Sequence, residues 1–171
     1  KIIRRLLDAR DLDFHEIAAV SPCIYVRKGH PLANRDEVTE EDLAGLPYVS
    51  FEHNQGVGSD YSEEYQLLSM KKPPRRISVN NRATMMNVLA ATDAYTTGRG
   101  LLVEGITSQA VVTMPLAGKT CIRIGWIRPR NSKLTPYVAQ FVGLLDQSIA
   151  ESIAFTESVH QSLCHSGEES S

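Results

Sequence analysis

Polar and charged side chains that could contact a ligand gather where three predicted strands end. They are Glu52 to Gln55 after one strand, Asn80 and Asn81 after another, and Thr97 to Arg99 after a third. In α/β proteins, ligands bind beyond the carboxyl ends of the strands, where helix N-termini point their amides. These three strand ends are therefore the candidate positions for ligand binding.

Catalysis at this site is not expected, and the chain is interpreted as a non-enzyme. Glu52 and His53 could act as an acid–base pair, but adjacent residues of a strand point to opposite faces. The sequence contains no serine-hydrolase elbow, no zinc-protease helix motif and no phosphate-binding loop. Gly56 and Gly58 could form an anion-binding turn. The alternative for residues 53–59 is an ordinary solvated loop.

No metal, cofactor or disulfide is expected. His15, His30, His160 and His165 have no spacing that joins them as metal ligands. The three cysteines lie too far apart in sequence to indicate a zinc site or a disulfide framework. We interpret Cys23 and Cys121 as small buried side chains within strands, whereas Cys164 lies near the tail. Reduced cysteines favour the cytoplasm.

Strands and helices alternate along the chain, which is typical of an α/β fold with a mostly parallel sheet. Extended segments are expected at 14–27, with a bend at Pro22, and at 48–52, 75–79, 94–97, 111–116 and 121–127. Helices are expected at 1–12, 40–46, 60–70, 82–92, 101–109 and from Leu134 onward. Asn80 and Asn81 are suited to cap the helix that follows them.

Composition excludes several classes of protein. The chain has 171 residues, of which 42% are hydrophobic, and its formal net charge is −2. This is enough apolar material for a core, and the charge gives no basis for binding nucleic acid directly. No apolar run approaches the roughly 20 residues of a membrane span, so no membrane partner is expected. A first residue of Lys1 indicates a fragment or a processed form.

The apolar pattern after Leu134 predicts a helix of about 46 Å if it continues unbroken to Cys164. Such a helix is longer than a small lobe can cover. Either a break near Ser148 to Ser152 or packing against another chain would resolve the difference. The residues expected at such an oligomer contact are Ile149, Ile153, Val159 and Leu163. Residues 166–171 are expected to be disordered.

Five blocks of the sequence resemble the effector-binding domain of LysR-type transcriptional regulators. They are VRKGHPLA at 26–33, TEEDLAGLPYVSFE at 39–52, AYTTGRGLL at 94–102, VVTMPLAG at 111–118, and IRIGWIRPRNSKLTPYVAQFVGLL at 122–145. They follow one another in the family's order, and the resemblance covers residues from about 12 to 147.

The resemblance implies an α/β fold like that of type 2 periplasmic binding proteins, in which two subdomains are joined by two crossing strands. The chain would hold one nearly complete Rossmann-like subdomain and part of a second. The crossings are expected near Ile17 to Ser21 and near Ile127 to Arg130. The implied division is a remnant of the first subdomain and crossing strand at 1–20, the second subdomain at 21–127, a crossing segment with the returning helix at 128–165, and the tail at 166–171.

The resemblance also implies a function, which is to bind a small effector between the subdomains and pass this event to a homodimer or homotetramer. DNA would be bound only through an N-terminal helix-turn-helix that this chain lacks. The implied effector-binding residues are Phe51, Glu52, His53, Asn54, Gln55, Asn81, Thr96, Thr97 and Gly98. Arg99 could pair with an anionic effector. Capping remains the alternative for Asn81 and for the threonines.

Two other functions stay open at this point. A solute-binding protein of a transport system has the same architecture, although its export would favour paired cysteines. An enzyme on the same scaffold would need catalytic motifs that are absent here. A helix-turn-helix or a signal peptide upstream would separate the regulator from the transport protein.

Overall fold

A computed structural model describes residues 2–52, 73, 75–105, 107–118 and 121–168. The predicted loop at 53–59 and the predicted helix at 60–70 lie outside the described residues. So do three of the candidate effector-binding residues, His53, Asn54 and Gln55.

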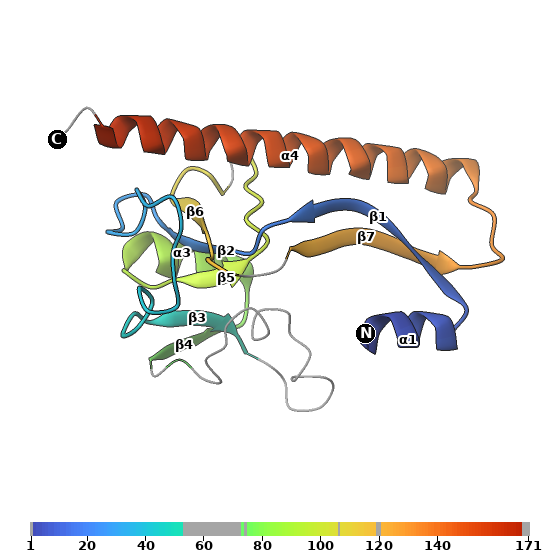
Figure 1. The fold of residues 1–171 in the computed structure, drawn as a ribbon, viewed down its shortest axis with the longest axis horizontal. Coiled ribbons are helices and arrows are strands. Elements are labelled where there is room, and N and C mark those ends of the chain that lie inside the picture. The colour runs from blue at the N-terminus through green and yellow to red at the C-terminus, as the bar shows by residue number, and fades with distance from the viewer. Residues whose placement is uncertain (1, 53–72, 74, 106, 119–120, 169–171) are drawn as a thin grey trace.

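A two-stranded antiparallel ribbon connects the two ends of the molecule (Figure 1). Its strands are β1, Leu12–Val20, and β7, Ile122–Pro129. The short helix α1, Ile2–Ala9, precedes the ribbon and lies at its far end. Arg130 links the helix to the ribbon, because its guanidinium lies 3.3 Å from Asp8 and 3.0 Å from Asp13. These ion pairs therefore connect α1 to the end of the ribbon that is distant from the main body.

The main body contains strands that mostly share one direction. β2, Cys23–Arg27, follows the ribbon and pairs antiparallel with both β5, Thr96–Gly98, and β6, Val111–Pro115. β3, Tyr48–Phe51, pairs in parallel with β4, Arg76–Val79. A parallel bridge between Tyr48 and Tyr95 joins β3 to the start of β5. Hence β3, β4, β5 and β6 run one way and β2 runs the other way.

The expected mostly parallel sheet is therefore only partly correct. The strand directions agree with it, but both neighbours of β2 are antiparallel to it. The cause is the connection through Pro22, which sends β2 away from the ribbon while β5 and β6 run back toward it. As a result, the carboxyl ends of β3, β4, β5 and β6 all lie at the ribbon side of the body.

Helix α3, Arg82–Ala91, begins where the sequence predicts. Asn81 is its N-cap, and the Asn81 side-chain oxygen accepts a hydrogen bond from the Thr84 amide at 2.8 Å. Met85 and Leu89, one turn apart, are buried. The predicted cap is confirmed, because capping depends on local spacing.

Two predicted helices are wrong, since the described residues form turns instead. At 40–46 the amides bond to carbonyls three residues back, such as Leu43 to Glu40, and Gly45 at a φ of 85° ends the run. Thr39 and Asp42 still cap each other's amides there. Between 101 and 109, the amide of Val103 bonds to the Thr107 hydroxyl at 2.8 Å.

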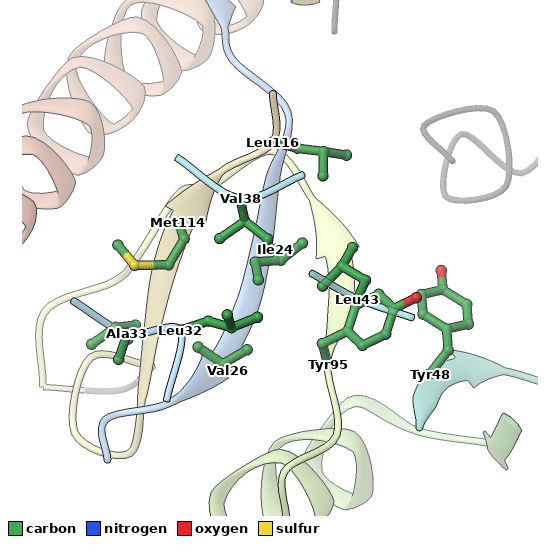
Figure 2. Packing of buried hydrophobic residues seen from close by; sticks show 11 residues of the cluster. Ile24, Val26, Leu32, Ala33, Val38, Leu43, Tyr48, Tyr95, Met114 and Leu116 are labelled. Carbon is green, nitrogen blue, oxygen red and sulfur yellow. The ribbon is translucent and has the colours of Figure 1, made fainter. Parts of the chain in front are cut away.

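Each face of the body's strands is covered by its own hydrophobic cluster. One cluster includes Ile24, Val26, Tyr48 and Tyr95, and Figure 2 shows the two tyrosine rings side by side, with centroids 5.3 Å apart. The second cluster contains the alternate residues of the same strands, together with α3; its members are Tyr25, Val49, Val79, Met85, Leu89, Ala94, Leu102 and Val111. This alternation follows from the two-residue period of a strand.

A single helix, α4, Pro136–Glu168, spans the molecule. Its 33 residues correspond to about 50 Å. Of the two alternatives for this helix, a break near Ser148 to Ser152 is excluded, and the helix enters the predicted disordered tail as far as Glu168. Phe155 and Val159 pack against the body's clusters. The first half of α4 instead exposes Tyr137, Phe141 and Leu144, whose exposed fractions are 84%, 63% and 59%.

The cysteines differ in their burial. Cys23, the first residue of β2, is buried as expected, and burial raises the pKa of its thiol to about 11. Cys121 is exposed, so its predicted burial is wrong. It lies just before β7 begins, where its side chain has no sheet face to enter.

Candidate ligand-binding site

A cavity of about 210 Å³ lies at the carboxyl ends of β3 and β5, beside the N-terminus of α3. It also contacts the start of β7, so the body and the ribbon both contribute to its wall. Its lining residues are Tyr25, Phe51, Arg82, Met85, Met86, Thr96, Thr97, Gly98, Arg99, Leu101 and Ile122. The ends of β3 and β5, which are far apart in sequence, therefore meet at one cavity.

Four of the candidate effector-binding residues line this cavity. Phe51 comes from the end of β3, and Thr96, Thr97 and Gly98 form β5. Glu52 is exposed and does not line it, although its amide bonds to Val79 at 2.7 Å.

Asn81 does not line the cavity either. Its side chain caps α3 and also donates a hydrogen bond to the Asn80 side chain at 2.8 Å.

Hydrogen bonds within the body hold β3 and β5 in place around the cavity. The Thr96 hydroxyl donates to the Val49 carbonyl at 2.8 Å, and the Tyr48 and Thr97 hydroxyls lie 3.1 Å apart. The Val49 amide in turn donates to the Tyr95 carbonyl at 2.8 Å. The two threonines are buried, so these bonds fix both strand ends relative to each other.

Tyr25 packs directly beneath Gly98. A Cβ atom at Gly98 would lie 2.9 Å from the Tyr25 ring, which explains why glycine suits this position. The Tyr25 hydroxyl donates to the Leu101 carbonyl at 3.2 Å. The ring therefore supports the segment after β5, which forms one side of the cavity.

Among the described lining residues of the cavity, the two charged ones are both positive. They are Arg82, the first residue of α3, and Arg99, which directly follows β5. Burial raises the pKa of Tyr25 to about 12, and the charges of both arginines act in the opposite direction. Both cations therefore lie close enough to interact with the same phenol. None of the described lining residues is Asp, Glu, His or Cys.

Arg82, Met85 and Met86 line the cavity but are missing from the sequence-based set of site residues. The sequence signal that could have identified these three residues is their position directly after the strand end at Asn80 and Asn81. Residues in the first turns of a helix that starts at a strand end face the same edge as that end. Arg99 was recognised as a possible anion contact, whereas an ordinary surface position was the alternative.

Two larger cavities lie along α4. One, of about 400 Å³, shares Arg99 and Leu101 with the candidate site and contacts Thr156 and His160 of the helix. The other, of about 420 Å³, lies between β1 and the middle of α4 and is lined in part by Ile149 and Ile153. The segment from Arg99 to Leu101 thus separates the candidate site from a cavity beneath α4.

Within the described part of the chain, no group of His, Cys, Asp and Glu side chains is arranged to hold a metal ion. None of its helices combines the length and apolarity that crossing a membrane requires.

Comparison with solved structures shows a shared fold. The effector-binding domain of QuiR in complex with shikimate has a TM-score of 0.54 at 17% identity, over 82% of this chain and 66% of that one. The regulatory domain of NMB2055 (MetR), a LysR family regulator from N. meningitidis, has a TM-score of 0.62 at 14% identity, over 83% and 66%. The BenM effector-binding domain with benzoate has a TM-score of 0.54 at 13% identity, over 82% and 64%.

The chain spans between about half and two thirds of the first solved structures that it matches. No curated protein sequence matches it significantly. The model of the LysR substrate binding domain family matches residues 2–150, which is most of the chain. This match confirms the resemblance seen in the sequence blocks and the implied α/β fold. The chain therefore belongs to the LysR substrate binding domain family.

Proposed function

We propose that this chain is the ligand-sensing part of a bacterial LysR-type transcriptional regulator, and that its cavity binds a small anionic effector. One observation carries the proposal: Phe51 at the end of β3 and Thr97 in β5 line one cavity together with two arginines, Arg82 and Arg99, and none of the described lining residues is an acid. Concave sites with a few convergent polar groups are the usual form of small-molecule sites. QuiR and BenM, whose ligands are the carboxylates shikimate and benzoate, share the fold.

The mechanism proposed is a population shift. Ile122, at the start of β7, lines the cavity together with residues of the body. A ligand that contacts both parts favours one placement of the ribbon against the body, provided that it binds the two placements with different affinity. The division into a first-subdomain remnant at 1–20, a second subdomain at 21–127, and a returning segment at 128–165 belongs to this proposal, except that residues 122–127 are assigned to the ribbon because β7 pairs with β1.

We also propose that the protein acts as a homodimer or homotetramer in the cytoplasm, and that it reaches DNA through a helix-turn-helix outside this sequence. Exposed apolar side chains at spacings of three and four on α4, Tyr137, Phe141 and Leu144, support self-association. The sequence predicts instead a contact through Ile149, Ile153, Val159 and Leu163. Val159 has packing partners within its own chain, and the side chain of Leu163 lies outside the described residues.

The oligomer proposal is tested by mass measurement in solution. One variant carries Phe141→Ser and Leu144→Ser, and a second carries Ile149→Ser and Ile153→Ser. Gln140→Ser, at an exposed position of the same helix, is the control. We expect dissociation from the first variant and an unchanged mass from the control. Dissociation only in the second variant would favour the sequence-based contact, and a monomeric parent chain would refute self-association of this part of the protein.

The effector proposal is tested by thermal unfolding with benzoate and shikimate as the first probes. A ligand at about a hundred times its dissociation constant stabilises the protein by about 2.7 kcal/mol. Met86→Trp fills the cavity, whereas Ala90→Trp adds the same side chain at an exposed position of α3 outside the lining. Stabilisation that disappears in Met86→Trp and persists in Ala90→Trp places the ligand in the cavity. Stabilisation that survives Met86→Trp would contradict this site.

A further inference from the structure

We propose that the effector is a monocarboxylate without an amino group, with Arg82 and Arg99 binding its carboxylate and a flat apolar body lying against Met85, Met86 and Phe51. This inference rests on the proposed function and specifies the ligand class of the same cavity.

The positive charge of the site comes from two separate elements. Arg82 projects from the first turn of α3, and Arg99 from the segment after β5, yet both line one cavity and both act on the Tyr25 phenol. No described carboxylate pairs with Arg82. A guanidinium offers a planar pair of donors that matches a carboxylate, and the N-terminus of α3 adds a favourable dipole.

Two hydroxyl groups of the described lining already donate within the protein. The Thr96 hydroxyl donates its proton to Val49, and the Tyr25 hydroxyl donates to Leu101. A ligand rich in hydroxyl groups would therefore find neither of these two hydroxyls available as a donor. A ligand with an ammonium group would find no carboxylate among the described lining residues. These two conditions disfavour sugars and free amino acids.

The rest of the lining is apolar and adaptable. Met85 and Met86 lie one turn beyond Arg82 on α3, and Phe51 and Ile122 complete the apolar side. Thioether side chains are flexible and make favourable contacts with aromatic rings. The cavity of about 210 Å³ exceeds the roughly 150 Å³ that is known to accommodate benzene. The space therefore accommodates a six-membered ring that carries one short acidic arm.

The experiment compares four probes by calorimetric titration of the whole chain. Phenylacetate is the acid, phenylacetamide its neutral isostere, phenylalanine the amino acid, and glucose the polyol. We expect phenylacetate to bind at least about tenfold more tightly than each of the others, because one charge-assisted interaction is worth about that much. Arg82→Gln and Arg99→Gln should each weaken phenylacetate binding by a similar factor. Arg75→Gln, at an exposed position outside the cavity, should leave it unchanged.

The outcomes separate this inference from the proposed function. Equal binding of phenylacetate and phenylacetamide, or tighter binding of phenylalanine or glucose, overturns the monocarboxylate assignment. If the probe that binds in such a case loses its affinity in Met86→Trp, the ligand-sensing function of the cavity still stands. Retained phenylacetate affinity in both arginine variants also overturns the assignment. Failure of all four probes to bind at millimolar concentration overturns the assignment too, whereas stabilisation by shikimate that depends on the cavity would preserve the function.

Discussion

The backbone amide of Leu102 donates a hydrogen bond to the hydroxyl of Thr156 at 2.9 Å, although the two residues are 54 positions apart. Leu102 is fully buried, and it directly follows Leu101, which lines both the candidate site and the cavity beneath α4. The Thr156 hydroxyl in turn donates a hydrogen bond to the Ser152 carbonyl at 2.7 Å. This bond ties the wall of the ligand cavity to the long helix.

Thr156→Val keeps the shape of the side chain but removes the acceptor for the Leu102 amide. A buried amide without a partner costs about 1–3 kcal/mol, so we expect the free energy of unfolding to fall by that amount. Chemical denaturation measures it. Ser162→Ala, at an exposed position of the same helix, removes a hydrogen bond to the Ser158 carbonyl and should change stability little. Equal effects of the two substitutions would mean that the Leu102 contact adds nothing.

Gly100→Ala should be more destabilising than Gly118→Ala, although both glycines have a positive φ, 72° and 66°. A Cβ at Gly100 would lie 2.6 Å from the Cys23 sulfur, whereas a Cβ at Gly118 meets nothing within 4 Å. Left-handed alanine alone costs about 1–2 kcal/mol, and the contact adds to this at Gly100. Urea unfolding of both variants measures how far each lowers the free energy of unfolding. A larger loss for Gly118→Ala than for Gly100→Ala would contradict the prediction.

Asn81→Ala should lower stability by about 1 kcal/mol, because it removes the acceptor that caps the Thr84 amide. Asn87→Ala, at an exposed position within the same helix, is the matched control and should be neutral or slightly stabilising. Thermal unfolding measures both. An Asn81→Ala variant of unchanged stability but weakened ligand binding would instead assign Asn81 to effector contact, as the family resemblance implies.

His30 should make the protein less stable as the pH falls below about 6.5. Burial lowers the pKa of this ring below its ordinary value of 6.5, and its Nδ1 accepts a hydrogen bond from the Leu32 amide at 3.0 Å. The neutral ring is therefore favoured in the folded state. Its contribution to stability is complete above the unfolded pKa and is lost as the pH falls through the folded pKa.

His30→Asn supplies an acceptor that does not titrate in this range, so its unfolding free energy should change less between about pH 7 and pH 5. The Asp42 carboxyl does not interfere, because the Thr39 amide and hydroxyl hold its pKa below the ordinary 3.8. Denaturant titrations at several pH values measure the difference. Identical pH profiles for the variant and the parent chain would exclude His30 as the cause.

Local patterns predicted the elements whose formation depends on neighbouring residues. The strand at β3, the Asn81 cap and the long helix α4 agree with the sequence within a few residues. The predicted helices at 40–46 and 101–109 are wrong, because the described residues of both segments form turns, and at 40–46 Gly45 with its positive φ ends the run. Cys121 is exposed although the sequence predicts its burial, because it lies just before the ribbon strand β7 and burial there depends on where the ribbon leaves the body.

The candidate site likewise contains some features that the sequence predicts and others that it does not. Polar residues after strands are visible in the sequence, and Phe51, Thr96, Thr97 and Gly98 do meet in one cavity. The reach of Arg82 and Met86 into that cavity depends on how α3 packs against the strands, which periodicity does not encode.

The order of the amino acids by itself determined the α/β class, the family blocks and the strand ends where polar groups collect, because these follow from short-range spacing. Only the tertiary structure decided that β2 runs against its neighbours, that two arginines from different elements share one cavity, and that α4 remains unbroken while its second half packs on the body. Contacts between residues far apart in the chain set these features, and their free energies depend on a geometry that no local window contains.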